Sequence, residues 1–380
     1  MARIAVVYFE AGGGHRNAAT ALEQAVKQAN PAWAVELVNL QELLDSIDII
    51  RQLTGLRVQD VYNRMLRNGW TLGSAQLMRM LQGIIRVYHR KTVRLLERYW
   101  RELQPGLVVS LVPHFNGALC ESLRKACPDK PFVTILTDIA DYPPHFWIEQ
   151  QEQFVICGSE RAVEQARGLG HPVEHVFQTS GMILNPGFYN YGPIDRKAER
   201  TRNGLDAERM TGLVLFGGQG ARKKMLEIDR RLSESGLPIQ LVLICGKNER
   251  LQRELRAQVR EIPRLVEGFT TSVPYYMQLA DFFIGKPGPG SIAEAMAMGL
   301  PVIVERNAWT LPQERYNAVW VREKQVGSVV SSFKRIAEAV TQLLEKDTFT
   351  RFRCNARRMH NRALFEIPVI LSQILQQSNR

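Results

Sequence analysis

The feature that most constrains the fold is a pattern that occurs repeatedly in both halves of the chain: a short apolar run, a glycine-containing turn and a helical stretch. Unbroken apolar runs of about four to eight residues are typical of parallel strands covered by helices on both faces. Strands that alternate with helices form βαβ units. The sequence therefore predicts an α/β fold with two Rossmann-like lobes, each built around a doubly wound parallel sheet.

The apolar runs fall into two series. The first begins at residues 4–9, before a glycine turn and a helix that Asn30-Pro31 ends. The other strands of this series are predicted at 35–40, 107–112, 132–137 and 154–157. The second series is predicted to have strands at 213–216, 239–244, 282–284 and 301–304.

Composition marks the boundaries between these series. A chain of 380 residues is long enough for two domains with their own cores. The stretch 181–210 is rich in Pro, Gly, Tyr and charged residues and has little periodicity. We expect an N-terminal lobe at 1–185, a linker at 186–210 and a C-terminal lobe at 211–349. A final helix is expected at 350–380, with a break near Pro368.

The excess positive charge is concentrated in one segment. The chain has a net charge of +11, and residues 51–101 hold ten Arg and one Lys against Asp60 and Glu97, a net charge of +9. This segment is predicted to form helices inserted between strands. Its apolar positions at Leu77, Met80, Leu81, Ile84, Ile85, Val87 and Tyr88 lie beside or opposite Arg79, Arg86, Arg90 and Arg94. Such a helix either binds phosphate, of nucleic acid or anionic lipid, or packs with a solvated basic face.

Several classes of protein are disfavoured. Hydrophobic residues make up 45% and charged residues 23%, which is typical of globular proteins. No apolar run reaches the ~18 residues of a membrane span, and residues 1–9 read as a core strand rather than a signal peptide. The scattered cysteines, without a CxxC pair, favour a reducing cytoplasm. They are Cys120, Cys127, Cys157, Cys245 and Cys354.

The strongest local signal lies at 281–301, where a strand, a Gly-Pro loop and a helix follow one another. A helix that starts near Gly288, Pro289, Gly290 and Ser291 would direct free N–H groups and its dipole at a diphosphate. Glu294, one turn further on, could accept hydrogen bonds from ribose hydroxyls. The alternative is structural, because Ser291 and Glu294 also have the spacing of a capping box. The sequence leaves both possibilities open.

Two more glycine turns of the C-terminal lobe follow strands, one at Gly217-Gly218 and one at Gly246-Lys247-Asn248. Because the carboxyl ends of parallel strands share one edge of a sheet, three such loops favour a ligand site there. None has the spacing of a P-loop or of the G-x-G-x-x-G dinucleotide fingerprint.

In the N-terminal lobe, His15 follows a glycine turn that ends at Gly14. A histidine in this setting can act as a general base near neutral pH. Asp138, at the end of a predicted strand, is placed to orient His15 or to act as the base itself. His114, His145 and Trp147 are candidates to line the same cleft, although an isolated histidine is more often structural.

These segments together resemble the monogalactosyldiacylglycerol synthase family. That family includes bacterial diacylglycerol glucosyltransferases and, more distantly, the peptidoglycan enzyme that adds N-acetylglucosamine to a lipid-linked precursor. The resemblance covers nearly the whole chain. It rests on GGGHR at 12–16, ICGKN at 244–248, GKPGPGSIAEA at 285–295 and PQERYN at 312–317.

The resemblance implies a GT-B fold, in which two Rossmann-like lobes face each other across a cleft and the C-terminal helix packs back on the N-terminal lobe. It implies transfer of galactose or glucose from a UDP-hexose to diacylglycerol with inversion, without a metal or other cofactor. His15 and Asp138 would be catalytic. The implied donor-binding residues are Gly14, Gly217, Gly218, Lys247, Asn248, Phe269, Gly288, Pro289, Gly290, Ser291, Glu294, Gln313 and Glu314. Arg79, Arg86, Arg90, His145 and Trp147 would serve the acceptor and the membrane.

Two segments depart from the family pattern. Leu311-Pro312 stands where the family usually has glycine before the Gln-Glu pair, and residues 141–147 are rearranged around His145. Both lie at sugar or acceptor positions, so the exact sugar and lipid stay open.

The expected enzyme is cytoplasmic and peripheral on the inner face of the membrane, with anionic lipids and no nucleic acid as partners. The alternatives are a UDP-sugar epimerase, a transferase with another acceptor, and a nucleic-acid-binding protein. The last would explain the charge but not the glycine loops.

Overall fold

The computed structural model describes residues 2–10, 14–45, 74–142 and 146–378. The described chain forms two compact units. The N-terminal unit contains the described residues up to Asn185 together with those from Asn361 onward, and the C-terminal unit contains Pro186–His360.

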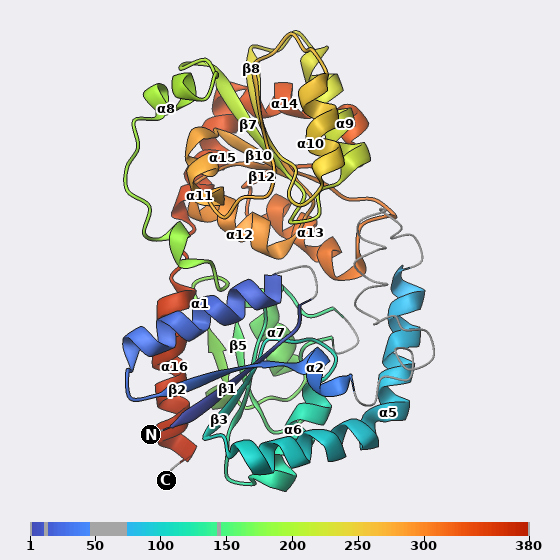
Figure 1. The fold of residues 1–380 in the computed structure, drawn as a ribbon, viewed down its shortest axis with the longest axis vertical. Coiled ribbons are helices and arrows are strands. Elements are labelled where there is room, and N and C mark those ends of the chain that lie inside the picture. Colours follow the sequence, from blue (N-terminus) through green and yellow to red (C-terminus); the bar gives the residue numbers. More distant parts are fainter. Residues whose placement is uncertain (1, 11–13, 46–73, 143–145, 379–380) are drawn as a thin grey trace. The chain divides into compact units, whose positions relative to one another are not determined.

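The N-terminal unit is built on a six-stranded sheet of order β2-β1-β3-β4-β5-β6 (Figure 1). All of its strand pairs are parallel, as predicted. The strands are β1 (Arg3–Tyr8), β2 (Ala34–Asn39), β3 (Leu107–Ser110), β4 (Phe132–Ile135), β5 (Phe154–Cys157) and β6 (Val176–Gln178).

Helices cover both faces of this sheet. On one face, α1 (Gly14–Ala29) packs against α16 (Ala363–Ser378), and both contribute to one apolar core with the strands. On the other face, α2 (Leu40–Leu44), α5 (Ser74–Leu103) and α6 (Asn116–Ala126) share a second core. One more helix of this unit, α7 (Glu160–Gly168), packs against β5 and β6. The predicted return of the C-terminal helix to the N-terminal lobe is confirmed.

Helix α5 covers the described part of the predicted basic segment. Its second half is anchored by Val93, Leu96 and Trp100, which are buried against α6 and the sheet. The predicted apolar face was wrong at Val87, which is 78% exposed. Residues 51–73 and the Arg79 side chain lie outside the described residues.

The C-terminal unit has a second parallel sheet of order β12-β11-β10-β7-β8-β9. Its strands are β7 (Met210–Leu215), β8 (Ile239–Ile244), β9 (Arg264–Glu267), β10 (Phe282–Gly285), β11 (Val302–Glu305) and β12 (Gly327–Val330). On one face, α9 (Arg222–Ser233), α10 (Glu249–Ala257) and α14 (Ile336–Leu344) complete a large apolar core. The other helices are α8 (Arg196–Arg202), α11 (Val273–Leu279), α12 (Pro289–Ala297), α13 (Arg315–Glu323) and α15 (Lys346–Arg358).

The predicted strands are all present, and their bounds differ by at most three residues at either end. Three strands were missed: β6, β9 and β12, which all lie at sheet edges. An edge strand has a neighbour on one side only, and these three combine buried and partly exposed positions. They therefore lack the unbroken apolar run that identifies a central parallel strand.

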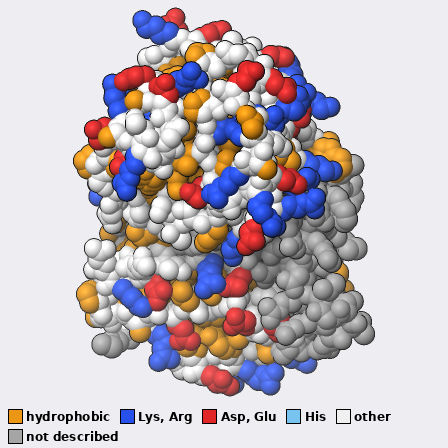
Figure 2. Space-filling view, turned by 45° about the horizontal axis from the view of Figure 1, so that its top comes forward, with side chains coloured by type: hydrophobic (Ala, Val, Ile, Leu, Met, Phe, Trp, Pro, Cys, Tyr) orange, Lys and Arg blue, Asp and Glu red, His pale blue; other side chains and the backbone are white. Residues whose placement is uncertain are grey.

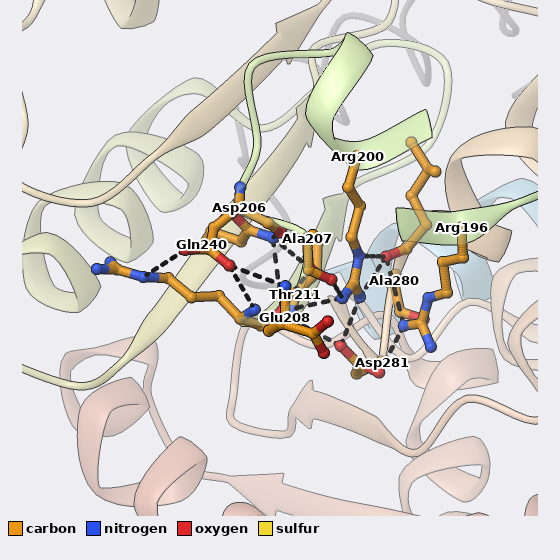
Figure 3. Close-up of polar contacts among 11 residues, drawn as sticks. Arg196, Arg200, Asp206, Ala207, Glu208, Thr211, Gln240, Ala280 and Asp281 are labelled. Carbon is orange, nitrogen blue, oxygen red and sulfur yellow. Dashed lines mark hydrogen bonds and ion pairs between the residues drawn. The ribbon is translucent and has the colours of Figure 1, made fainter. Parts of the chain in front are cut away.

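A buried ionic cluster fixes the predicted linker segment to the C-terminal unit (Figure 3). Asp281 accepts hydrogen bonds from Nη2 of Arg196 at 2.5 Å and Nη2 of Arg200 at 2.7 Å. Its Oδ2 also accepts from the backbone N–H of Thr211 at 2.8 Å. Arg200 is only 4% exposed. Residues predicted to be an irregular linker thus include a helix, α8, tied to the amino ends of β7 and β10.

The predicted final helix is divided differently from the expectation. It consists of α15, which lies in the C-terminal unit and packs against α12, and α16, which lies in the N-terminal unit. The break falls at 359–362, whereas Pro368 lies buried inside α16. Burial of the apolar residues around Pro368 offsets the lost backbone hydrogen bond.

Candidate functional site

Each sheet has one point where the order of strand addition reverses. In the N-terminal unit this point lies between β1 and β3, and in the C-terminal unit it lies between β7 and β10. Ligands of open α/β sheets bind outside the carboxyl ends of the strands at such switch points. Some of the residues predicted from sequence follow the strands at these two points, and the others lie in neighbouring loops or on helix α5.

In the C-terminal unit, the loops after β7 and β8 are in direct contact. The backbone N–H of Lys247 donates to the carbonyl of Gly218 at 2.8 Å. Gly246 has φ +58°, and a Cβ added there would lie 2.4 Å from the Gly218 carbonyl oxygen. Gly217 also has a positive φ, +72°. Glycine is required where two backbone segments approach this closely or where a residue has a left-handed conformation. The contact between the two loops therefore explains why glycine occurs at Gly217 and Gly246.

The loop after β10 leads into the start of α12. Gly288 is the N-cap residue and Pro289 the first helical residue, with no side-chain capping bond. The capping-box alternative is therefore wrong, because Ser291 lies inside the helix. Gly290 and Ser291 occupy the first turn, where backbone N–H groups have no intrahelical acceptor. The positive end of the helix dipole lies at the same place, which suits a diphosphate.

Glu294 lies in the second turn of α12 and is partly buried. Burial raises the pKa of its carboxyl group to about 7. Near neutral pH its charge can therefore respond to a ligand. Hydrogen bonds donated by ligand hydroxyl groups would favour the ionised form.

The Gln313-Glu314 pair lies on a short 3-10 helix, Pro312–Glu314, beside the loop after β10. Glu314 is 6% exposed, and its Oε1 lies 2.5 Å from Nζ of Lys286. The amide of Asn317 donates to the carbonyl of Pro287 at 2.8 Å. No role was assigned to Lys286 or Asn317 from sequence, because their partners lie about 30 residues away along the chain.

Lys247 and Phe269 are also brought together, from the loops after β8 and β9. The Lys247 ammonium group lies 5.3 Å from the centre of the Phe269 ring, which is 61% exposed. The exposed ring offers a flat surface on which a base can stack. Asn248 has a structural role, because its side chain caps α10 by accepting from the N–H of Leu251 at 3.0 Å.

In the N-terminal unit, His15 lies in the first turn of α1, immediately after Gly14. Its Nδ1 is 3.2 Å from Oγ1 of Thr137, which follows β4. Burial lowers the pKa of the imidazole to about 4, and a hydrogen bond to the Leu111 carbonyl opposes this shift. The ring is therefore neutral at physiological pH and can accept a proton.

Asp138 and Trp147 lie at the same edge of the sheet. The indole N–H of Trp147 donates to Oδ2 of Asp138 at 2.8 Å, and the Trp147 ring centre lies 5.9 Å from that of His15. The side-chain amide of Asn116 holds this segment by donating to the Trp147 carbonyl at 2.8 Å. His114 lies on the loop after β3, with its ring against Phe146. His145 is outside the described residues.

The acceptor side of the prediction also includes α5. Arg86 and Arg90 are exposed on this helix beside Val87. On the face shown in Figure 2, Lys and Arg side chains lie among Asp and Glu side chains. None of the helices within the described residues is long and apolar enough to cross a membrane. The same residues contain no group of three or more His, Cys, Asp or Glu side chains that could hold a metal ion.

Comparison with known proteins finds sequences similar to this chain. Residues 212–374 match the glycosyltransferase family 28 C-terminal domain. Monogalactosyldiacylglycerol synthase 1 of Arabidopsis thaliana is 31% identical over 248 residues, 62% of this chain and 45% of that protein. Synthase 2 of the same plant is 26% identical over 397 residues, 98% of this chain and 81% of that protein. The chain spans about half the length of the curated relatives that it matches at about 30% identity.

The fold also has relatives among solved structures. The crystal structure of MurG from Acinetobacter baumannii has a TM-score of 0.62 and 14% sequence identity, covering 98% of this chain and all of the other. At this identity the likeness concerns the fold alone. The predicted GT-B type is thereby confirmed.

Proposed function

We propose, on the premise that residues 212–374 are a glycosyltransferase family 28 C-terminal domain, that this protein transfers a hexose from a UDP-sugar to diacylglycerol. The sugar is galactose or glucose, and the product is a β-linked glycolipid. The observation that supports the donor is the assembly of the glycine loops after β7, β8 and β10 around one switch point.

The donor would be held by backbone and side-chain groups of these loops. The N–H groups of Gly290 and Ser291 and the dipole of α12 bind the diphosphate, and Glu294 accepts from the ribose. Gln313 and Glu314 bind sugar hydroxyl groups, and Phe269 stacks on the uracil. Fixed N–H groups and a helix dipole stabilise the negative charge that develops on the departing UDP, without a metal ion.

The N-terminal unit supplies the proton acceptor in this proposal. The acceptor hydroxyl oxygen attacks the anomeric carbon as the bond from that carbon to the UDP oxygen breaks, so the configuration inverts. The hydroxyl proton passes to the neutral imidazole of His15, and UDP leaves with the bonding electrons. Thr137 fixes the orientation of the ring through Nδ1, while Asp138 and Trp147 form its surroundings.

The lipid acceptor is supported by the resemblance to monogalactosyldiacylglycerol synthases and by the exposed basic side chains of α5. Arg86 and Arg90 flank the exposed Val87, and this combination suits contact with an anionic lipid surface. We infer from this that the protein acts in the cytoplasm on the inner face of the membrane.

The test uses purified protein with radiolabelled UDP-galactose or UDP-glucose in separate reactions, each with diacylglycerol in anionic micelles. Thin-layer chromatography should show a labelled glycolipid from one donor. Micelles without diacylglycerol and the variant His15→Ala should give none above about 10⁻² of the wild-type rate, since general-base catalysis contributes typically 10²–10⁴-fold. If UDP binds but neither sugar reaches lipid, the acceptor assignment is wrong. Chromatography of the nucleotide sugars would then show whether the protein is an epimerase.

A further inference from the structure

His114 occupies a position that the mechanism above does not use. It lies in the loop between β3 and α6, three residues beyond Leu111, whose carbonyl contacts the His15 imidazole. Because β3 pairs with β1, this loop borders the switch point of the N-terminal sheet on the side opposite His15. A ligand bound at that switch point would meet both histidines.

The backbone at His114 is strained. Its φ is +69°, in the left-handed region, and it is one of three non-glycine residues with positive φ among the described residues. Its backbone N–H donates to the Phe146 carbonyl at 2.7 Å, which holds the loop in this conformation. Such strain persists only where the surrounding structure enforces it, and it is concentrated at functional sites.

The two ring nitrogens of His114 are buried without a hydrogen-bond partner among the described residues. Both ring nitrogens are inaccessible to solvent, and neither has a hydrogen-bond partner within the described part of the chain. The ring packs edge-to-face on Phe146, with 4.1 Å between ring centres. Leaving a buried donor and acceptor unpaired is unfavourable. An apolar side chain could pack against Phe146 equally well without two buried nitrogens. The presence of these nitrogens therefore indicates a polar ligand.

The protonation state narrows the kind of ligand. Burial lowers the pKa of the His114 imidazole to about 4. At neutral pH the ring is uncharged and presents one N–H donor and one lone pair. It can therefore donate to one ligand oxygen and accept from one ligand hydroxyl, a pair that a group with hydroxyl and carbonyl oxygens supplies.

We propose that His114 is a positioning residue that hydrogen-bonds the glycerol end of the lipid acceptor. This inference rests on the proposed function. The hydroxyl and ester groups of diacylglycerol supply both an acceptor and a donor for a neutral imidazole. With the glycerol end held at His114 on one side of the switch point, its free hydroxyl is presented to His15 on the other.

Two substitutions test this without disturbing the backbone. His114→Gly removes the side chain at a φ that glycine adopts freely, and His114→Asn keeps polar atoms in a residue that tolerates this region. His171→Asn is the matched control, because His171 is also buried in this unit but its Nε2 already pairs with the Glu149 carbonyl at 3.1 Å.

The kinetic result expected is selective. His114→Gly should raise KM for dioctanoylglycerol about tenfold, the size of one lost hydrogen bond, and leave KM for the UDP-sugar unchanged. His114→Asn should recover part of the loss, and the control should leave both constants unchanged. If the partner of His114 is only a buried water, the acceptor KM of His114→Gly will be unchanged, and this result would overturn the proposal. An equal rise of KM for the donor and for the acceptor would overturn it as well.

A second measurement does not depend on turnover. In protein with ¹⁵N-labelled histidine, the His114 ring resonances are those missing from His114→Asn. The chemical shifts of these resonances should change when dioctanoylglycerol is added without the UDP-sugar donor. Unchanged chemical shifts at saturating lipid would contradict the proposal. If the resonances shift although no sugar is transferred, the proposed reaction fails while the binding role of His114 stands.

Discussion

The indole Nε1 of Trp147 donates a 2.8 Å hydrogen bond to Oδ2 of Asp138, and both side chains are buried. The position of this carboxylate is therefore set by Trp147. His15 is oriented by a different group, Oγ1 of Thr137. The residues predicted to be catalytic are thus both held by side chains of the loop that joins β4 to β5.

Removing the indole N–H tests this arrangement. We expect Trp147→Phe to lower the free energy of unfolding by about 1–3 kcal/mol, because it leaves a buried carboxylate oxygen without its donor. The transfer rate should fall as well, since Asp138 and the ring beside His15 are no longer fixed. Urea unfolding and the lipid-labelling assay measure the two effects. Trp309→Phe is the control at a 46% exposed tryptophan; an equal loss there would show that the indole–carboxylate bond is not the cause.

The contact between the loops after β7 and β8 should be sensitive to a single methyl group. Gly246→Ala places a Cβ 2.4 Å from the Gly218 carbonyl oxygen, so the loops must separate, and we expect UDP affinity to fall about tenfold or more, the equivalent of one lost hydrogen bond. Gly236→Ala is the matched control, because Gly236 has a similar φ, +68°, with open space around it. It should cost stability but leave UDP binding, measured by calorimetry, unchanged. Equal effects on UDP binding would count against the loop contact.

The cluster around Asp281 should be a large contributor to the stability of the C-terminal unit. Asp281→Asn leaves Arg200 buried without its counter-ion, and breaking a buried pair in this way costs about 3–5 kcal/mol. Denaturant unfolding measures the loss. The control is Glu208→Gln, which removes a pair between two exposed side chains, Glu208 and Lys197. Exposed pairs contribute little, and a comparable loss in both variants would contradict the assignment.

Glu294 should make UDP binding dependent on pH. Its pKa is raised to about 7 by burial, so the free protein carries it partly protonated near neutral pH. Hydrogen bonds from ribose hydroxyls favour the carboxylate, so binding should release a proton and UDP affinity should rise as the pH increases from 6 to 8. Calorimetry in two buffers of different ionisation enthalpy measures the release. The variant Glu294→Gln should abolish it, and undiminished release in that variant would exclude Glu294 as the source.

The exposed basic side chains of α5 should control membrane attachment. We expect Arg86→Ser, Arg90→Ser and Arg94→Ser together to reduce flotation with anionic liposomes, since each basic group near such a surface contributes about 1 kcal/mol. Added salt should reduce wild-type flotation in the same way. The matched control replaces three exposed arginines of α6 and α7, namely Arg124, Arg161 and Arg167. Equal losses in both triple variants would show that total charge, rather than α5, is responsible.

The central architecture and much of the candidate donor site could be predicted from sequence. The central strands are unbroken apolar runs because both faces of a parallel sheet are covered, and local sequence alone shows this. The glycines at 217, 246 and 288 could be identified as loop residues because each follows such a run. The edge strands β6, β9 and β12 and the break between α15 and α16 were not predicted, because exposure and packing against distant residues decide them.

What the sequence alone determined is therefore the order of strands, turns and helices and the kinds of group carried at the strand ends. It could not show that Lys286 pairs with Glu314, that Trp147 donates to Asp138, or that His114 is strained and lacks a partner. The Trp147–Asp138 bond lies within the single loop between β4 and β5 and depends on how that loop folds. The other two features depend on which strands become neighbours in the sheet. That choice brings together loops that are separated by tens of residues along the chain, and only the tertiary structure makes it.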